Sequence, residues 1–193
     1  MDTQNWYRGE YLLSTDPKLL QVDAINVALG SDMVWWASDL PAVALLKALK
    51  NSLCFGLYKI DSSQESNGTI NLERAGEWQS YFSTKKDALT KLIPYQGSIK
   101  QIGLLRVITD NVTFAYLTDF YILDSYQGSG LARWMLDIFN ERLRQWPYLR
   151  RAMLLTTDKM HLFNKLLGMK NYSEFDGMNG VSIAMVEGPG AQH

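Results

Sequence analysis

Small residues gather in the segment Gln127-Gly128-Ser129-Gly130-Leu131-Ala132, which separates an apolar run from a helical pattern. A chain that passes from a strand through glycines into a helix leaves several backbone N–H groups unpaired at the positive end of the helix dipole. Donors arranged in this way bind phosphate groups. The small residues at 128, 130 and 132 let the backbone approach a diphosphate closely, where a larger side chain would collide. The segment therefore predicts a phosphate site, and an ordinary strand-to-helix turn is the simpler alternative.

The spacing of these glycines does not match two common nucleotide-binding motifs. A dinucleotide fingerprint requires G-x-G-x-x-G and an acidic residue about 20 positions later. A P-loop ends in G-K-S or G-K-T, and this segment does not. A nucleotide-binding protein of another α/β type is therefore a weak third hypothesis for the function.

The elements on either side of the segment support a strand that leads into a helix. The run from Phe114 to Leu123 is rich in aromatic and β-favouring residues, which predicts a central strand. From Leu131 to Leu143, apolar residues such as Met135 and Ile138 recur at three- and four-residue spacing, which predicts a helix.

The pattern Gln127-x-x-Gly130-x-Ala132 resembles the pyrophosphate-binding motif of the GNAT superfamily of acetyl-CoA-dependent N-acetyltransferases. The segments 13–17, 35–37 and 51–58 are similar to the N-terminal half of a GNAT branch found in microbes and fungi. The resemblance covers most of the chain except about residues 61–98.

A second GNAT signature, usually F-Y-x-x-x-G-F, is matched near the C-terminus by Phe163, Gly168 and Met169. Asn164 stands where the family commonly has the tyrosine that protonates the departing thiolate of coenzyme A. An amide cannot donate a proton as a phenol can. Release of the thiolate would then use water, another residue such as Tyr172, or spontaneous protonation.

The resemblance implies an α/β (α+β) fold with a mixed central sheet of about six or seven strands, helices on both faces and a splayed strand pair that holds acetyl-CoA. It implies direct transfer of an acetyl group from acetyl-CoA to a primary amine of a small molecule or a peptide. Backbone groups at the end of the central strand would hold the pantetheine arm, and residues 127–132 would hold the diphosphate. The implied cofactor-binding residues are Tyr121, Ile122, Leu123, Gln127, Gly128, Ser129, Gly130, Leu131, Ala132 and Thr157.

In this superfamily a backbone N–H near a strand bulge polarises the thioester carbonyl, which stabilises the developing oxyanion. The attacking amine must also lose a proton, so a base or a water relay is needed. Asp119 is the catalytic candidate because it interrupts an otherwise apolar strand just before the pantetheine-binding segment. The alternative is that Asp119 anchors a neighbouring loop by accepting hydrogen bonds.

The competing function from a different class is a non-catalytic module that binds or senses acyl-CoA on a GNAT scaffold. Such a module would keep the diphosphate loop and lack a productive acid and base, which Asn164 partly matches. Release of free thiol from acetyl-CoA across a panel of amines separates the two functions.

Composition limits the possible partners. A chain of 193 residues, of which 47% are hydrophobic, predicts one domain, with an insertion at 61–98 that is either a substrate lid or a packed excursion. The 19 basic and 20 acidic residues nearly cancel, which argues against nucleic acid as a partner. Without a basic leader or a long apolar run, we expect no membrane partner and a cytoplasmic monomer or homodimer.

The chain has too few cysteine and histidine residues for a disulfide or a metal site built from these residues. Cys54 is the only cysteine and lies in an apolar run, which predicts a buried structural thiol. The histidines are His161, which we expect to cap or pack a helix, and the terminal His193. We therefore expect no metal site.

The remaining pattern predicts the order of the elements along the chain. The predicted strands are 6–13, 53–60, 99–109, 113–123, 150–157 and 181–186, the predicted helices are 19–29, 40–50, 131–143 and 162–169, and residues 188–193 are a tail.

Overall fold

Six strands of the described residues form one mixed sheet, in which the strand order follows the chain from β1 to β6. The computed structural model describes residues 3–61, 98–157, 159–175 and 183–184. Neighbouring strands are antiparallel, except that β5 and β6 are parallel. The strands are β1 (Asn5–Arg8), β2 (Tyr11–Ser14), β3 (Leu53–Asp61), β4 (Ser98–Thr109), β5 (Phe114–Ile122) and β6 (Arg151–Leu154). This sheet confirms the mixed central sheet that the sequence predicts.

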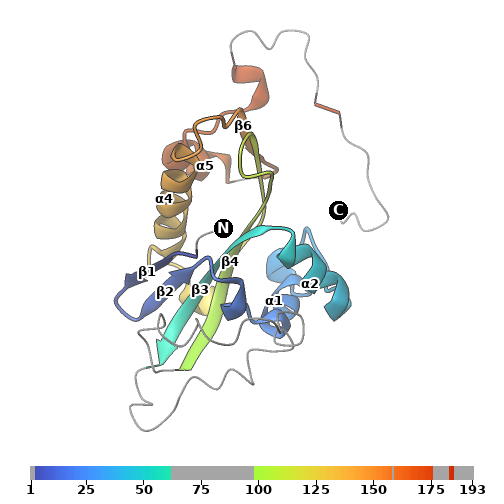
Figure 1. The fold of residues 1–193 in the computed structure, drawn as a ribbon, viewed down its shortest axis with the longest axis vertical. Coiled ribbons are helices and arrows are strands. Elements are labelled where there is room, and N and C mark those ends of the chain that lie inside the picture. The colour runs from blue at the N-terminus through green and yellow to red at the C-terminus, as the bar shows by residue number, and fades with distance from the viewer. Residues whose placement is uncertain (1–2, 62–97, 158, 176–182, 185–193) are drawn as a thin grey trace.

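Helices cover both faces of the sheet (Figure 1). The helices are α1 (Val22–Leu29), α2 (Ala42–Lys50), α4 (Leu131–Arg144) and α5 (Met160–Leu167), with short 3-10 turns η1 (Pro17–Leu19), η2 (Asp32–Val34), η3 (Asp124–Tyr126) and η4 (Tyr172–Glu174). Helices α1 and α2 bury Ile25 and Leu49 in a core on one face. Helices α4 and α5 bury Phe139 and Phe163 in a core on the other face. Among the described residues, no helix is long and apolar enough to cross a membrane.

Strand β3 shows how one strand serves both cores. Successive side chains of a strand point to opposite faces of the sheet. Leu53, Phe55 and Leu57 lie in the core beneath α4 and α5, whereas Cys54 lies in the core beneath α1 and α2. A strand that is buried on both faces therefore reads as an almost continuous apolar run.

The single strand predicted at 6–13 is wrong, because the structure forms a hairpin from β1 and β2 at this position. Arg8 is opposite Tyr11 in the strand register, so Gly9 and Glu10 make the turn. Gly9 has a φ of 57°, a left-handed conformation that glycine adopts without steric cost and that such hairpin turns require. The glycine inside an apparently continuous strand pattern was the signal for the turn.

Helix α1 begins later than the predicted range 19–29. Pro17–Leu19 forms the separate turn η1, in which the side chain of Asp16 accepts a hydrogen bond of 3.0 Å from the N–H of Lys18. Asp16 therefore caps this turn, and the N-cap of α1 is Gln21. The other predicted helices at 40–50, 131–143 and 162–169 differ from α2, α4 and α5 only at their ends.

Strands β5 and β6 form the splayed pair that the resemblance implies. They pair only from Phe114 opposite Arg151 to Leu117 opposite Leu154. Strand β6 then ends, whereas β5 continues through Ile122. The second half of β5 therefore has no partner strand on this side among the described residues.

Three predicted segments fall wholly or largely outside the described residues. Residues 62–97 of the predicted insertion are not described, but Asp61 at the end of β3 is opposite Ser98 at the start of β4. The insertion thus connects two strands that are already paired. The strand predicted at 181–186 is described only at 183–184, which are not in a strand, and the tail at 188–193 is not described.

Trp6 attaches β1 to the core, and its replacement tests this attachment. The Trp6 ring stacks on Phe55 at a centroid distance of 6.1 Å, and Phe55 in turn meets the edge of Phe139 on α4 at 6.0 Å. We predict that Trp6→Ala lowers the free energy of unfolding by about 3 kcal/mol, the lower end of the range for buried aromatic residues, because Trp6 is only partly buried. Urea denaturation measures this loss.

The matched control is Tyr7→Ala on the opposite face of β1, where the side chain is 49% exposed. Its loss should stay below about 1 kcal/mol. Equal losses in the two variants would contradict the packing of Trp6.

Candidate functional site

The loop between β5 and α4 has the conformation that its glycines make possible. After turn η3, Gly128 has a φ of 78° and Gly130 a φ of 76°. Gly130 is the N-cap of α4 and has no side chain to cap the helix. A Cβ at Gly128 would meet no atom within 4 Å, so the conformation and not the space requires glycine there.

The N–H groups of residues 128–133 donate no hydrogen bond to any described residue. The first bond of the helix runs from the N–H of Trp134 to the carbonyl of Gly130 at 3.1 Å. Before the loop, the N–H groups of Tyr126 and Gln127 are bound within η3. The unpaired donors therefore begin at Gly128 and lie at the positive end of α4, where residues 128–130 are exposed.

Gln127 holds this loop to the end of the central strand. Its side-chain nitrogen donates to the carbonyl of Ile122 at 2.8 Å and to Oδ1 of Asp124 at 2.9 Å. Nearby, the hydroxyl of Ser129 donates to the carbonyl of Tyr126 at 2.9 Å. Both residues are predicted to bind the cofactor through their main chain; in this structure their side chains stabilise the loop, and the N–H of Gln127 is already bonded to the carbonyl of Asp124.

The main-chain groups at the end of β5 point in alternate directions. The N–H of Leu123 donates to Ile102 on β4 at 2.9 Å, and the carbonyl of Tyr121 faces Gly103 on the same strand. The carbonyl of Ile122 faces the opposite side, where Gln127 binds it. Of the three residues predicted to hold pantetheine, only Ile122 directs its main chain to the side from which β6 has separated.

The side chain of Tyr121 lies in the core beneath α1 and α2. Its burial, and to a smaller degree the charge of Asp119, raises the pKa of Tyr121 above the ordinary value. The phenol therefore stays neutral and takes part in packing.

A β-bulge lies where the strand pair separates. Leu117 is the last residue of β5 that pairs with β6. Thr118 and Asp119 then lie opposite the single residue Arg106 of β4, since Leu105 pairs with Phe120 and Val107 with Leu117. A bulge leaves a main-chain group outside the ladder of hydrogen bonds and turns the following side chains to the other face. The separated strands and the bulge thus occur at one point of the sheet.

Asp119 is buried and paired with Arg106. Nε of Arg106 lies 2.6 Å from Oδ2 of Asp119, and the two side chains are 16% and 10% exposed. Nη1 of Arg106 also donates to the hydroxyl of Ser52 at 3.1 Å, and Thr118 donates to Oδ1 of Asp119 at 3.4 Å. The geometry therefore supports an anchoring role for Asp119, which is the alternative to a catalytic role. A lone arginine in the apolar run of β4 was the signal for a buried partner.

Helix α5 contains the second sequence signature. Phe163 is buried and meets Phe120 of β5 edge to face, with ring centroids 6.3 Å apart. Gly168 ends the helix with a φ of 68°. The amide of Asn164 donates to the carbonyl of Met169 at 2.8 Å, so this side chain closes the helix end. The hydroxyl of Tyr172 is buried and has no hydrogen-bond partner among the residues that the structure describes.

The structure also describes the three remaining residues for which the sequence predicts a role, namely Thr157, Cys54 and His161. Thr157 is exposed beyond the end of β6. The Sγ of Cys54 lies 3.8 Å from the carbonyl of Leu49, and burial raises the pKa of the thiol to about 12, which confirms a structural thiol. His161 is exposed in the first turn of α5. In the part of the chain that the structure describes, no group of His, Cys, Asp or Glu residues could hold a metal ion.

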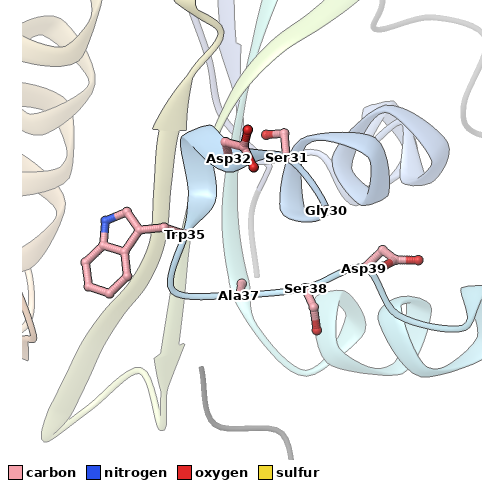
Figure 2. A pocket seen from close by; sticks show the side chains of 7 residues that line it. All are labelled: Gly30, Ser31, Asp32, Trp35, Ala37, Ser38 and Asp39. Carbon is pink, nitrogen blue, oxygen red and sulfur yellow. The ribbon is translucent and has the colours of Figure 1, made fainter. Parts of the chain in front are cut away.

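A shallow depression of about 360 Å³ lies in the connection between α1 and α2 (Figure 2). Two of its side chains, Asp32 and Asp39, are acidic, which suits a positively charged group. Trp35 is 52% exposed and meets Trp36 edge to face at 5.9 Å. Figure 2 shows the Trp35 ring directed away from the two carboxylates. The depression is lined by Gly30, Ser31, Asp32, Trp35, Ala37, Ser38 and Asp39.

A protein of Gibberella zeae named "Putative acetyltransferase FG08082" is 62% identical to this chain over 192 residues, which cover 98% of this chain and 96% of that protein. No family model matches the sequence.

Two solved structures share the fold. A protein from Xanthomonas campestris pv. campestris, described as belonging to the GNAT family, aligns with a TM-score of 0.60 at 23% identity over 92% of this chain and 93% of that chain. The GNAT family protein SP0256 from Streptococcus pneumoniae TIGR4 aligns with a TM-score of 0.51 at 17% identity over 92% of this chain and 96% of that chain.

The buried ion pair allows a direct test of the anchoring role of Asp119. Asp119→Ala leaves the guanidinium of Arg106 buried without its carboxylate, which should lower the free energy of unfolding by about 3–5 kcal/mol. The double variant Arg106→Met with Asp119→Leu removes both charges and should lose much less. Urea denaturation of both proteins gives the comparison. A loss below about 1 kcal/mol in the single variant would contradict the anchoring role.

Proposed function

The chain belongs to the GNAT superfamily of acetyltransferases, and from this premise we propose that it transfers the acetyl group of acetyl-CoA directly to a primary amine of a small molecule or a peptide. The observation that supports acetyl-CoA as the donor is the set of unpaired N–H groups at 128–133, next to the gap between β5 and β6. A diphosphate on this loop would place the rest of the cofactor beside the free edge of β5.

In the proposed complex, N–H groups from Gly128 to Ala132 bind the diphosphate. The pantetheine arm follows the edge of β5 between the separated strands, where it meets main-chain groups of Ile122. The carbonyl of Ile122 accepts a hydrogen bond from the side-chain amide of Gln127 in this structure. Pantetheine would therefore bind the N–H of Ile122 or displace the Gln127 amide from the carbonyl. Thr157 would approach the arm from the chain that follows β6.

The transfer needs no covalent enzyme intermediate. The amine nitrogen attacks the thioester carbon, the C–N bond forms, and the C–S bond breaks. The amine loses one proton, and the thiolate gains one to leave as the thiol of coenzyme A. A main-chain N–H at the bulge of Thr118 and Asp119 would stabilise the oxyanion, and the fixed position of the two reactants supplies much of the remaining acceleration.

Two routes are available for the proton of the amine. Oδ2 of Asp119 is bound by Arg106, which leaves Oδ1 as the only oxygen that could accept the proton. If Asp119 acts only as an anchor, water takes the proton. Loss of the pH dependence of the rate in Asp119→Asn would assign the base role to Asp119, and an unchanged profile would assign it to water.

The second candidate function is a module that binds acyl-CoA without transferring the acetyl group. The use of Asn164 to close α5, together with the pairing of Asp119, supports this alternative, because Asn164 has no acidic proton to donate and Arg106 occupies one of the two carboxylate oxygens of Asp119.

Release of free thiol from acetyl-CoA separates the two functions. We predict that the protein binds coenzyme A in calorimetry and releases thiol faster with at least one amine of a panel that includes small amines and peptide N-termini. Binding without release for every amine would support the binding module. Absence of binding by folded protein would contradict both functions.

Tyr172 is the proposed donor of the proton to the thiolate, because its buried hydroxyl has no partner in the described residues. We predict that Tyr172→Phe lowers kcat for thiol release by about tenfold, less than the about 10²–10⁴ of a full general acid, since a thiolate is a tolerable leaving group. Tyr148→Phe is the control, because Tyr148 is 72% exposed. Equal kcat values for Tyr172→Phe and the parent protein would remove Tyr172 from the mechanism.

A further inference from the structure

Arg8 of the N-terminal hairpin contacts the phosphate loop from 122 positions away in the chain. Its Nη1 donates to the carbonyl of Gly130 at 3.0 Å. A Cβ built on Gly130 would lie 3.7 Å from Nη1 and 3.5 Å from Nη2. Both terminal nitrogens of the guanidinium therefore lie close to the N-cap of α4.

The hairpin places Arg8 there through its alternating side chains. Trp6 and Arg8 are two residues apart in β1 and so point to the same face of the sheet. Trp6 packs on Phe55, which meets Phe139 of α4. Figure 1 shows β1 near one end of α4, and the bond to Gly130 identifies this end as the N-terminus.

The contact also fixes the peptide that joins Gly130 to Leu131. The carbonyl of Gly130 accepts from the N–H of Trp134 at 3.1 Å as well as from Arg8. In a trans peptide the N–H points opposite to the carbonyl. The N–H of Leu131 is therefore directed away from these two donors, on the side of the other unpaired groups.

The loop has no positive side chain of its own. Between Leu123 and Ala132 the only charged residue is Asp124. The next basic residue, Arg133, lies 3.8 Å from Asp137 one turn further along α4. Coenzyme A carries a diphosphate and a 3′-phosphate, so main-chain donors alone leave several negative charges without a counter-charge.

Arg8 can supply this charge because the nearby acid is engaged elsewhere. Glu10, on the same hairpin, forms an ion pair with Lys59 of β3. The side chain of Arg8 is exposed, and a guanidinium has five N–H donors, of which the bond to Gly130 uses one. Guanidinium groups with free donors bind phosphate strongly and with defined geometry.

We propose that Arg8 is a coenzyme A-binding residue whose guanidinium, held on the Gly130 carbonyl, binds a phosphate group of the cofactor on the loop. This inference rests on the proposed binding of coenzyme A. It adds a residue of the N-terminal hairpin to the phosphate site, which the sequence motif places within residues 127–132.

The test compares Arg8→Gln, Arg8→Lys and the parent protein for affinity to coenzyme A by calorimetry. Arg8→Gln should raise Kd by about 10- to 100-fold, the range for hydrogen bonds to charged groups. Its Kd should also depend less on salt concentration than that of the parent protein, because a screened charge has been removed. Arg8→Lys keeps the charge and should fall between the two. The control is Arg144→Gln, which makes the same charge change at the far end of α4 and should leave Kd unchanged.

The same proteins with 3′-dephospho-coenzyme A identify which phosphate Arg8 binds. If Arg8→Gln weakens the affinity for coenzyme A but not for the dephosphorylated ligand, Arg8 binds the 3′-phosphate. If the affinity for both ligands falls equally, Arg8 binds the diphosphate. An unchanged Kd in Arg8→Gln would overturn the proposal. A raised Kd with the salt dependence of the parent protein would also overturn it, because Arg8 would then only shape the loop. If the parent protein itself bound no coenzyme A, the proposed function would fail first.

Discussion

Unpaired main-chain N–H groups at the start of α4 are the central feature of the proposed site. The N–H groups of residues 131–133 are unpaired because they belong to the first turn of α4, and those of 128–130 lie in a loop with two left-handed glycines; no described residue binds these donors. Because Gln127 and Ser129 use their side chains inside the loop, the donors stay in place without a ligand. If the loop binds an anion, as we propose, binding requires little reorganisation.

The sheet determines where the rest of a bound cofactor could lie. Strand β6 leaves β5 after Leu117, and the bulge at Thr118 and Asp119 follows at once. The pairing of Asp119 with Arg106 stabilises this irregular point from the face of α1 and α2, while Phe163 of α5 packs on Phe120 from the other face. Within the described residues, an unpartnered strand edge and a main-chain group outside the ladder thus occur along β5, and the unpaired N–H groups of α4 follow it, as the proposed binding of a long thioester cofactor requires.

The elements around the motif could be predicted from the sequence because local patterns determine them. The apolar run of β5, the periodicity of α4 and the glycines at 128 and 130 each act within a few residues. The sequence could not show contacts between distant residues. Arg8 contacts Gly130 only because the turn at Gly9 folds β1 back on β2. The sequence pattern at 6–13 predicts a single strand and does not show this turn. In the same way, the role of Asp119 depended on Arg106 of a neighbouring strand, and the role of Gln127 on the carbonyl of Ile122.

Hydrogen exchange at the amides of residues 128–133, with and without saturating coenzyme A, shows whether these donors bind the cofactor. These amides are unpaired in the described structure, so they should exchange fast in the free protein and slowly once phosphate oxygens accept from them. The amides of Tyr126 and Gln127, which are already bonded within η3, provide an internal comparison. Slow exchange that appears at 128–133 with the cofactor is the predicted result. Fast exchange that persists there while calorimetry shows the cofactor bound would contradict the account.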